Sequence, residues 1–339
     1  MASTSQPETP RRRRTTIVLA ALALVVLALA GGWWLRHRSA GGAGGAGGSA
    51  LIVGDQRGGV QALLRASGEL DNVPYKIDWA LFPAAAPLLE ALGSSAIDIG
   101  GIGGQPFAFA YASGAKIKVV YAARPIDGPD RGRSSAIIVP ARSPLRRVED
   151  LKGRRIATIR GSAGQDLALR LLERHGLKPS DVTWVYLNNA EAKSALETGA
   201  IDAWSTWGAY VGYALIKDHQ RAIGDARELP GQAGFYAAND HAIASKRAQI
   251  ADFLARLSRA RAWLADHRAE YARVLARETG LPEDVARFTV EDLRTAPAPV
   301  DDSLRSEQLD ILNRYKAAGI IAKVPDLSGA FDSSFSKGQ

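Results

Sequence analysis

The sequence predicts an α/β protein of two similar lobes behind an apolar N-terminal helix, and three observations carry this prediction. Short β-type runs alternate with helical patterns from residue 51 onward, one strand–helix–strand pattern occurs twice, and residues 15–35 carry no charge. The chain has 339 residues, of which 46% are hydrophobic and 23% are charged. This composition is typical of a globular protein with room for roughly two domains, and it excludes a disordered chain, a collagen and a multispan transporter.

The cysteine count and the charge distribution exclude further classes. The chain contains no cysteine, so it has no disulfide, no thiolate metal site and no cysteine nucleophile. The formal charge is +8, but the first 50 residues contain six arginines and one glutamate, so most of the excess lies there. The basic balance therefore argues little for nucleic-acid binding.

The first 50 residues predict a targeting segment in three parts. Residues 1–14 form a basic leader on the cytoplasmic side, because four arginines precede the apolar stretch and two follow it. Residues 15–35 are long enough to span a membrane as a helix, and residues 36–50 form a linker rich in Gly and Ala. A cleaved signal peptide ending at Ala28-Leu29-Ala30 is the alternative. Either alternative places the rest of the chain in the periplasm or at the outer face of the cytoplasmic membrane.

Six short runs of β-type residues predict strands, with helical patterns between them. The runs are Leu51–Val53, Lys76–Trp79, Lys118–Tyr121, Ala136–Val139, Arg155–Ile159 and Thr183–Leu187. From about Ala244 the apolar residues recur at helical spacing, as in the stripe Ile250, Phe253, Leu257 and Leu264. The C-terminal third is therefore predicted to be mainly helical.

Two segments of the chain match each other without a gap. Residues 82–92 and 186–196 each contain a strand end followed by a helix, and four residues later each continues as Ala-Ile-Asp, at 96–98 and 200–202. The match predicts two lobes built on the same βαβ unit, whose strands end at loops that face a shared cleft. Ligands of open α/β sheets bind at such strand ends.

Two Gly-rich loops between a strand and a helix are candidates for anion binding. The first contains Gly103, Gly104 and Gln105, and the second contains Gly161 and Ser162. Glycine lets the backbone approach a ligand, and the N-terminus of a helix offers unpaired N–H groups with partial positive charge. Neither loop has the spacing of a P-loop or of a Rossmann motif. Tight turns and a capped helix are the alternative interpretation.

Aromatic and hydroxyl residues near the expected strand ends form a second set of candidates. Trp204 and Trp207 follow the second Ala-Ile-Asp and can either wall a cleft or belong to the core. Ser134 and Ser135 precede a strand near an expected crossover, and Tyr236 lies where the chain would cross back.

Catalytic and metal-binding motifs are scarce. The five histidines show no paired metal-ligand spacing, and no Gly-x-Ser-x-Gly motif is present. We therefore expect a protein without catalytic activity, cofactor or metal. An exported hydrolase that uses Ser162 with a distant histidine is the alternative.

Several ordered segments resemble the periplasmic substrate-binding proteins of the nitrate/sulfonate/taurine ABC importers, most of all the aliphatic-sulfonate-binding branch. The likeness spans residue 51 to about 335, and its most specific parts are 82–100, 143–157, 160–162 and 199–204 with Trp207 and Tyr210. The resemblance implies a type II periplasmic-binding-protein fold, in which two α/β lobes are joined by two crossover strands. Lobe 1 would comprise 51–140 and 237–339, and lobe 2 would comprise 141–236.

The resemblance also implies that the lobes close over one small ligand, which the protein delivers to an ABC permease and, through it, to the ATPase. Gly104 and Gly208 stand where family members often have an acid. A sulfonate stays ionised and only accepts hydrogen bonds, so the loss of these acids suits an anion and weakens the case for an ammonium-bearing ligand such as taurine.

We therefore expect a binding protein for an aliphatic sulfonate or a related small organic anion. Donors to the anionic head are expected from Gly103, Gly104, Gln105, Gly161 and Ser162, with further contacts from Ser134 and Ser135. The apolar tail is expected to be covered by Trp204, Trp207 and Tyr236, and the rim of the site to be closed by Gln56. A nitrate, a taurine or a pyrimidine or thiamine precursor bound on the same fold is the alternative.

Overall fold

Two β-sheets organise residues 49–338, the part of the chain that the computed structural model describes. The first sheet has the strand order β11-β4-β10-β3-β1-β2, and the second has the order β7-β6-β8-β5-β9. The expected segments 1–14 and 15–35, and nearly all of 36–50, lie outside the described residues. Within residues 49–338, no helix combines the length and the apolar character needed to span a membrane.

Strands and helices alternate along the first two thirds of the described chain. The strands are β1 (Leu51–Gln56), β2 (Ile77–Phe82), β3 (Ile99–Gly103), β4 (Ile117–Pro125), β5 (Ser135–Val139), β6 (Arg155–Thr158), β7 (Thr183–Tyr186), β8 (Ala203–Trp207), β9 (Arg221–Asp225), β10 (Gly234–Asn239) and β11 (Thr295–Ala298). The α-helices are α2 (Gly59–Ala66), α3 (Ala85–Gly93), α4 (Gly104–Ala112), α5 (Ala163–Arg174), α6 (Asn189–Glu197), α7 (Ala209–Gly212), α8 (Asp240–Ser245), α9 (Arg247–Leu264), α10 (Arg268–Thr279), α11 (Glu283–Glu291) and α12 (Asp302–Ala317).

The structure contains all six strands expected from β-type runs, and the helical C-terminal third is confirmed by α8–α12. Strands β9 and β11 have no counterpart among the expected strands. Strand β11 pairs antiparallel with β4 at the edge of the first sheet. Its Pro297 has no N–H to donate, and an edge strand tolerates this because its outer side needs no partner strand.

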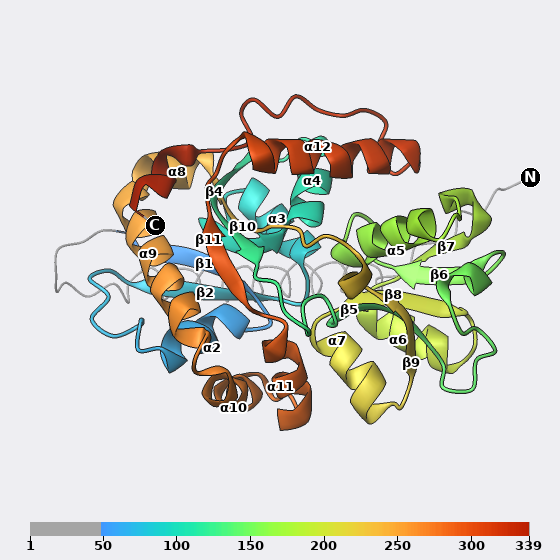
Figure 1. Ribbon diagram of the computed structural model, residues 1–339. Helices are drawn as coiled ribbons and strands as arrows, with labels where there is room; N and C mark the ends of the chain where they lie inside the picture. The colour runs from blue at the N-terminus through green and yellow to red at the C-terminus, as the bar shows by residue number, and fades with distance from the viewer. Residues whose placement is uncertain (1–48, 339) are drawn as a thin grey trace, which may run out of the picture. The chain divides into compact units, whose positions relative to one another are not determined.

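The chain passes between the two sheets twice, first between β4 and β5 and then between β9 and β10 (Figure 1). We call the first sheet with α2–α4 and α8–α12 lobe 1, and the second sheet with α5–α7 lobe 2. The expected boundaries, at 140/141 and 236/237, differ from this division. Strand β5 pairs with β8 and β9 in the second sheet, and β10 pairs with β3 and β4 in the first.

The internal repeat has a direct structural counterpart. Asp98 precedes β3, and its carboxylate accepts a 2.7 Å hydrogen bond from the N–H of Ile52 in β1. Asp202 precedes β8, and its carboxylate accepts a 2.8 Å hydrogen bond from the N–H of Arg155 in β6. Each central strand, β1 or β6, is flanked by two parallel strands. The two lobes therefore share one βαβ unit, but each new strand begins after the Ala-Ile-Asp and not on it.

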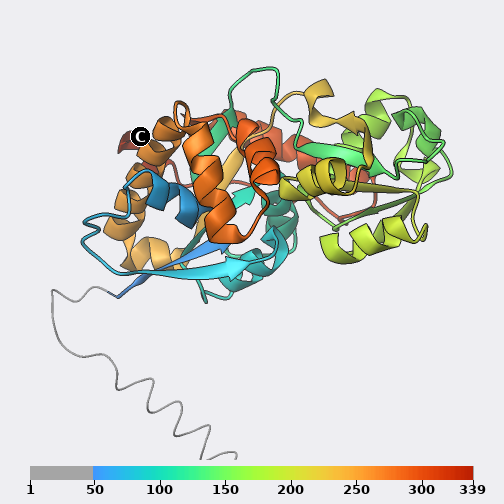
Figure 2. The same ribbon diagram turned by 90° about the horizontal axis from the view of Figure 1, so that it is seen from below.

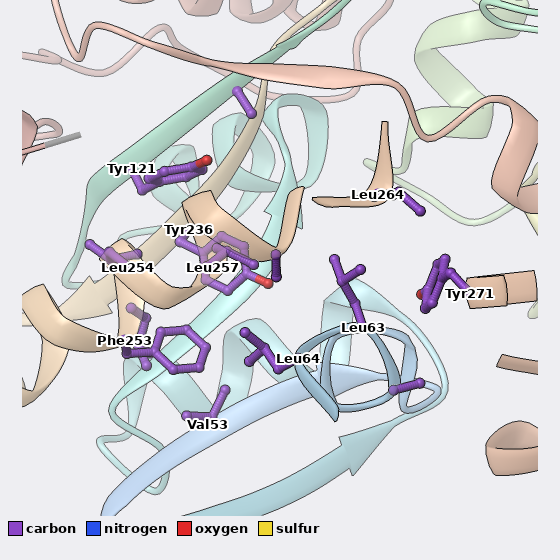
Figure 3. Close-up of a cluster of buried hydrophobic side chains, with 14 of the residues drawn as sticks. Val53, Leu63, Leu64, Tyr121, Tyr236, Phe253, Leu254, Leu257, Leu264 and Tyr271 are labelled. Atoms are coloured by element: carbon purple, nitrogen blue, oxygen red, sulfur yellow. The ribbon is translucent and has the colours of Figure 1, made fainter. Parts of the chain in front are cut away.

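Helices cover both faces of each sheet, so each lobe has two apolar cores. In lobe 1, α2, α9 and α10 cover one face of the sheet (Figure 3), and α3, α4 and α12 cover the other. In lobe 2, α5 covers one face, and α6 and α7 cover the other. Helix α3 lies very close to the first sheet, because a Cβ at Gly100 would lie only 2.7 Å from Leu88 of α3. This close approach holds the N-terminal end of α3 beside the ends of β1 and β3.

The lobes touch through helices as well as through the two connections. Helix α12 extends from lobe 1 to α5 of lobe 2 (Figure 1). On another side α11 packs on α7 (Figure 2). There Gly212 lies beside Val285 and Phe288.

Candidate functional site

A cavity of about 940 Å³ lies between the two lobes. Lobe 1 contributes the N-terminal ends of α3 and α4 and the side chain of Gln56, whereas lobe 2 contributes residues 159–163 and Trp207. All of these except the start of α3 come from segments in which the sequence predicted site residues. The cavity therefore joins Gly103 and Ser162, which we expected on opposite sides of one cleft.

The N-terminal ends of α3 and α4 are built alike. The residues before them, Ala84 and Gly103, are extended and provide no side-chain cap, and neither helix has an acid in its first turn. Each helix has proline at its third position, Pro87 or Pro106. Because first-turn N–H groups have no partner within the helix and proline lacks one, the first two residues of each helix carry the available donors. The positive ends of the two helix dipoles are therefore not neutralised by local carboxylates.

The third helix terminus at the cavity belongs to α5 and is already capped. The hydroxyl of Ser162 accepts a 3.2 Å hydrogen bond from the N–H of Gln165. The Gln165 side chain accepts a 2.7 Å bond from the N–H of Gly161, and the N–H of Ser162 donates to Ile159. The backbone donors that we expected Gly161 and Ser162 to offer a ligand are thus used within the loop. Ala163, the first residue of α5, lines the cavity at this end.

Gly161 is required by its conformation and by its neighbour. Its φ is +71°, in the left-handed region that favours glycine. A Cβ there would overlap the ring of Phe109, which reaches over from α4 of lobe 1. Two lobes therefore meet at this glycine, and Phe109 gives the cavity an aromatic wall.

Two residues of α12 bind the N-terminal end of α5 to lobe 1. The hydroxyl of Tyr315 donates a 3.3 Å hydrogen bond to the carbonyl of Ser162, and Arg314 forms a 2.8 Å ion pair with Asp166. Asp166 is fully buried, and burial raises the pKa of its carboxyl, although Arg314 and then Arg170 oppose this. The first turn of α5 thus carries an acid, but that acid is held by arginine.

Five of the expected site residues line the cavity, and six do not. Those that line it are Gln56, Gly103, Gly161, Ser162 and Trp207. Those that do not are Gly104, Gln105, Ser134, Ser135, Trp204 and Tyr236.

Trp204 and Trp207 are three residues apart in β8, so they point to opposite faces of the strand. Trp204 is 1% exposed and packs against Tyr210 on the side of α6 and α7. Trp207, at the end of β8, is the tryptophan that lines the cavity.

The serines and the glutamine lie at the connections between the lobes. Ser134 donates from both its N–H and its hydroxyl to Asp292, which follows α11 of lobe 1, and Ser135 begins β5. Gln105 donates a 2.6 Å hydrogen bond to Gln232, in the second connection. Gly104 faces the side chain of Gln308 in α12, because a Cβ there would lie 2.7 Å from its amide nitrogen. Ser134 and Gln105 thus join lobe 1 to the two connections, and Gly104 packs within lobe 1.

The sequence analysis missed the start of α3 and Phe109 as parts of the site. A signal was available for the helix, because Ala84-Ala85-Ala86-Pro87 repeats the pattern of the Gly103 loop, with proline at the third helical position. No local pattern marked Phe109, because its place opposite Gly161 depends on how the lobes meet.

The cavity wall is mostly apolar beyond the helix ends. Leu89, Pro106, Phe109 and Ala110 contribute apolar surface. Three charged residues, Glu90, Lys116 and Arg160, also line the cavity. The guanidinium of Arg160 lies over the ring of Tyr186 and donates to the carbonyl of Ile320. Among the described residues no group of three or more His, Cys, Asp or Glu side chains could hold a metal ion. The arrangement suits a small molecule with an anionic head and an apolar part.

Comparison with known proteins identifies the family of this chain. Residues 82–271 match the family described as NMT1/THI5 like. The chain belongs to this family. An aliphatic sulfonates-binding protein of Escherichia coli (strain K12) is 32% identical over 282 residues, covering 82% of this chain and 87% of that protein.

Two solved structures resemble this chain over most of its length. The periplasmic aliphatic sulphonate binding protein SsuA from Escherichia coli has a TM-score of 0.72 at 31% identity, covering 84% of this chain and 92% of that one. The alkanesulfonate-binding protein SsuA from Xanthomonas axonopodis pv. citri, bound to MOPS, has a TM-score of 0.77 at 29% identity, covering 85% and 99%. This member of the NMT1/THI5-like family thus has the α/β periplasmic-binding-protein fold.

Proposed function

We propose that this protein captures an aliphatic sulfonate or a related small organic anion between its two lobes and delivers it to an ABC permease. The observation that carries the proposal is the meeting of the N-terminal ends of α3 and α5 at one cavity, beside Gly103 and Pro106 at the start of α4, with no acid in the first turns of α3 and α4. The sulfonate-binding relatives support the same ligand class.

In this proposal the sulfonate oxygens accept hydrogen bonds from main-chain N–H groups at the helix starts, Ala85 and Ala86 in lobe 1 and Ala163 in lobe 2. A sulfonate offers only acceptors, and helix N-termini offer only donors with partial positive charge. The apolar tail lies against Phe109 and Trp207. Ligand that contacts both lobes binds the closed arrangement better than an open one, so it shifts the population toward closure.

The two connections act as the hinge of a type II periplasmic-binding-protein fold, and the closed form is what the permease, with its ATPase, recognises. The protein acts at the outer face of the cytoplasmic membrane or in the periplasm. Mass spectrometry of the exported protein tests the expectation for residues 15–35, since a new N-terminus at Gly31 indicates a cleaved signal peptide and an intact start indicates an anchor.

We also propose that the protein binds without catalysis. The hydroxyl of Ser162, the expected nucleophile of the hydrolase alternative, is engaged as the N-cap of α5. Its other close hydroxyl neighbour is Thr158, at 3.4 Å, which is not a general base.

Isothermal titration calorimetry tests the ligand. Butanesulfonate and octanesulfonate are compared with nitrate, sulfate, taurine and an aminopyrimidine under one buffer condition. We expect the alkanesulfonates to bind and to bind more tightly than inorganic anions. Binding of the aminopyrimidine alone would instead favour a thiamine-precursor protein, and the absence of binding by both alkanesulfonates would refute the proposed ligand.

A further inference from the structure

A second cavity, of about 260 Å³, lies inside lobe 1. We call it the inner chamber. It lies on the face of the first sheet that α2, α9 and α10 cover, and its wall includes Asp55 of β1, Tyr236 of β10 and Arg261 of α9. Gln56 lines both the inner chamber and the cavity between the lobes. Its side-chain amide donates a 2.8 Å hydrogen bond to the carbonyl of Gly101, so Gln56 forms a common wall.

Asp55 places a buried carboxylate in the inner chamber without a cation beside it. The residue is 1% exposed, and its oxygens accept hydrogen bonds from the N–H groups of Val60, at 3.2 Å, and Gln61, at 2.8 Å. Burial raises the pKa of Asp55 to about 6, these two bonds lower it, and no cationic side chain contributes. Because each carboxylate oxygen can accept a second hydrogen bond, Asp55 retains acceptor capacity. An ionised carboxylate buried without a cation is costly, so the chamber favours a positively charged guest.

Tyr236 supplies a second unsatisfied group. The residue is 1% exposed, and among the described residues its hydroxyl has no hydrogen-bond partner. Figure 3 shows this hydroxyl directed away from Tyr121 and toward the side of Leu63. A buried hydroxyl without a partner costs free energy, which a bound donor or acceptor recovers.

Arg261 does not neutralise Asp55. Its guanidinium lies 5.4 Å from the ring centre of Tyr121 and 5.9 Å from that of Tyr236, and it donates to the hydroxyl of Thr295. The rest of the wall is mainly apolar, with Leu63, Leu257 and Leu264. The chamber therefore combines the Asp55 carboxylate and the free Tyr236 hydroxyl with an apolar surface, and the Arg261 guanidinium lies at its wall, stacked near the two tyrosine rings.

We propose that the inner chamber binds an alkylammonium group, with its N–H donors on Asp55 and Tyr236 and its alkyl stem on the leucines. An ammonium has three donors and no acceptor, which matches a carboxylate with spare lone pairs and a hydroxyl that can accept. A hard metal ion fits less well, because it requires about six oxygen ligands. The group is either a free alkylamine or the far end of a ligand whose anionic head lies beyond Gln56. The second source rests on the proposed function, and the first does not.

Calorimetry of the full-length protein with propylammonium chloride tests the chamber at pH 7.5. The comparison salt is tetramethylammonium chloride, which has the same charge but no N–H donor. We expect binding of propylammonium only, weakened at least tenfold by Asp55→Asn and by Tyr236→Phe. Asp127→Asn, which changes a carboxylate that is 99% exposed, is the matched control and should leave binding unchanged.

A variant that does not fold would also lose binding, so folding is measured separately. Asp55 also holds the start of α2, so each variant is first compared with the parent by thermal unfolding, and Tyr236→Phe alone decides the question if Asp55→Asn does not fold. Absence of propylammonium binding, equal binding of tetramethylammonium, or unchanged affinity in Tyr236→Phe overturns the proposal.

A third titration separates the two sources. If 4-aminobutanesulfonate binds at least tenfold more tightly than butanesulfonate and Tyr236→Phe removes the difference, one ligand spans both cavities. If propylammonium binds and this difference is absent, the chamber takes a separate molecule. Butanesulfonate binding without any ammonium binding refutes the inner chamber and leaves the proposed function intact. If neither butanesulfonate nor octanesulfonate binds and propylammonium does, the proposed function is refuted and the inner chamber stands.

Discussion

Arg314 of α12 donates a 2.8 Å hydrogen bond to the buried carboxylate of Asp166 in α5 and so links lobe 1 to lobe 2. The side chain of Asp166 is 1% exposed, and a second arginine, Arg170, lies 4.0 Å from it. The ion pair lies at the same helix end that borders the ligand cavity. The position of that helix end therefore depends on a residue from the other lobe.

Removing this arginine should destabilise the protein strongly. Arg314→Gln leaves Asp166 buried with only the more distant Arg170, and breaking a buried ion pair from one side typically costs about 3–5 kcal/mol in the free energy of unfolding. Urea unfolding measures the loss. The double variant Asp166→Asn, Arg314→Gln should lose less than the sum of the two single variants, and additive losses would contradict the pairing.

Gly161→Ala should destabilise the protein more than an alanine at a comparable glycine. The matched control is Gly153→Ala, because Gly153 has φ +74° against +71° for Gly161 but has open space around it. Backbone strain alone should cost each variant about 1–2 kcal/mol. Overlap with Phe109 should add about 1–3 kcal/mol at Gly161 only. Equal losses in urea unfolding would show that the ring of Phe109 does not lie against Gly161.

An acid at the start of α3 should abolish anion binding without unfolding the helix. Ala86→Glu places a carboxylate in a first turn that has none, which stabilises a helix by about 0.3–1 kcal/mol but repels an anion. We expect alkanesulfonate affinity, measured by calorimetry, to fall at least tenfold. Ala190→Glu makes the same change in the first turn of α6, outside the cavity, and should bind as the parent does. Unchanged affinity in Ala86→Glu would remove α3 from the site.

Asp55 should make the protein less stable as the pH rises toward neutrality. Its pKa is raised by burial from 3.8 to about 6, so the folded state binds the proton more tightly than the unfolded state. The resulting stability is present below pH 4 and is lost as the pH rises through about 6, by roughly 3 kcal/mol in all. The difference in unfolding free energy between the parent and Asp55→Asn should follow this curve between pH 4 and 7. A difference that stays constant with pH would contradict the burial of an unpaired carboxyl.

The stability contributed by His175 should also fall as the pH rises, but at a higher pH than that contributed by Asp55. Its ring nitrogens lie 2.8 Å from Glu228 and 3.1 Å from Glu149. The hydrogen bond to Glu228, and then that to Glu149, raises the pKa of His175 above its ordinary value of 6.5. Its contribution is therefore complete below pH 6.5 and is lost as the pH rises through the higher folded value. The melting temperatures of the parent and of His175→Gln should converge between pH 6 and pH 9, and a constant gap would be inconsistent with a histidine that is charged between two glutamates.

Part of the candidate site could be predicted from the sequence, because it consists of loops whose position follows from the strand before them and the helix after them. Gly103 and Ser162 each stand between a strand and a helix, and a strand that ends before a helix places its loop at the sheet edge. Both residues line the cavity between the lobes, and their role in binding stays a prediction. Which backbone N–H groups are free to bind a ligand could not be predicted. The N–H of Gly161 donates to the side chain of Gln165, and this contact depends on the rotamer that packing imposes on Gln165.

The two tryptophans of β8 differ in whether they reach the cavity. They are three residues apart, so alternation along the strand directs them to opposite faces of the sheet. Trp204 packs in the core on the side of α6 and α7, and Trp207 lines the cavity. The spacing fixes that the two face opposite sides, whereas the face that each takes depends on how the helices pack on the sheet.

By itself the sequence determined the alternation of strands and helices, the repeated βαβ unit and the loops at the ends of its strands, because each depends on the residues within one short segment. Only the tertiary structure decided which helix ends share a cavity, that Phe109 covers Gly161, and that Asp55 and Tyr236 face one chamber. These relationships join residues distant in the chain, and they arise from how sheets and helices pack, which no local pattern of residues specifies.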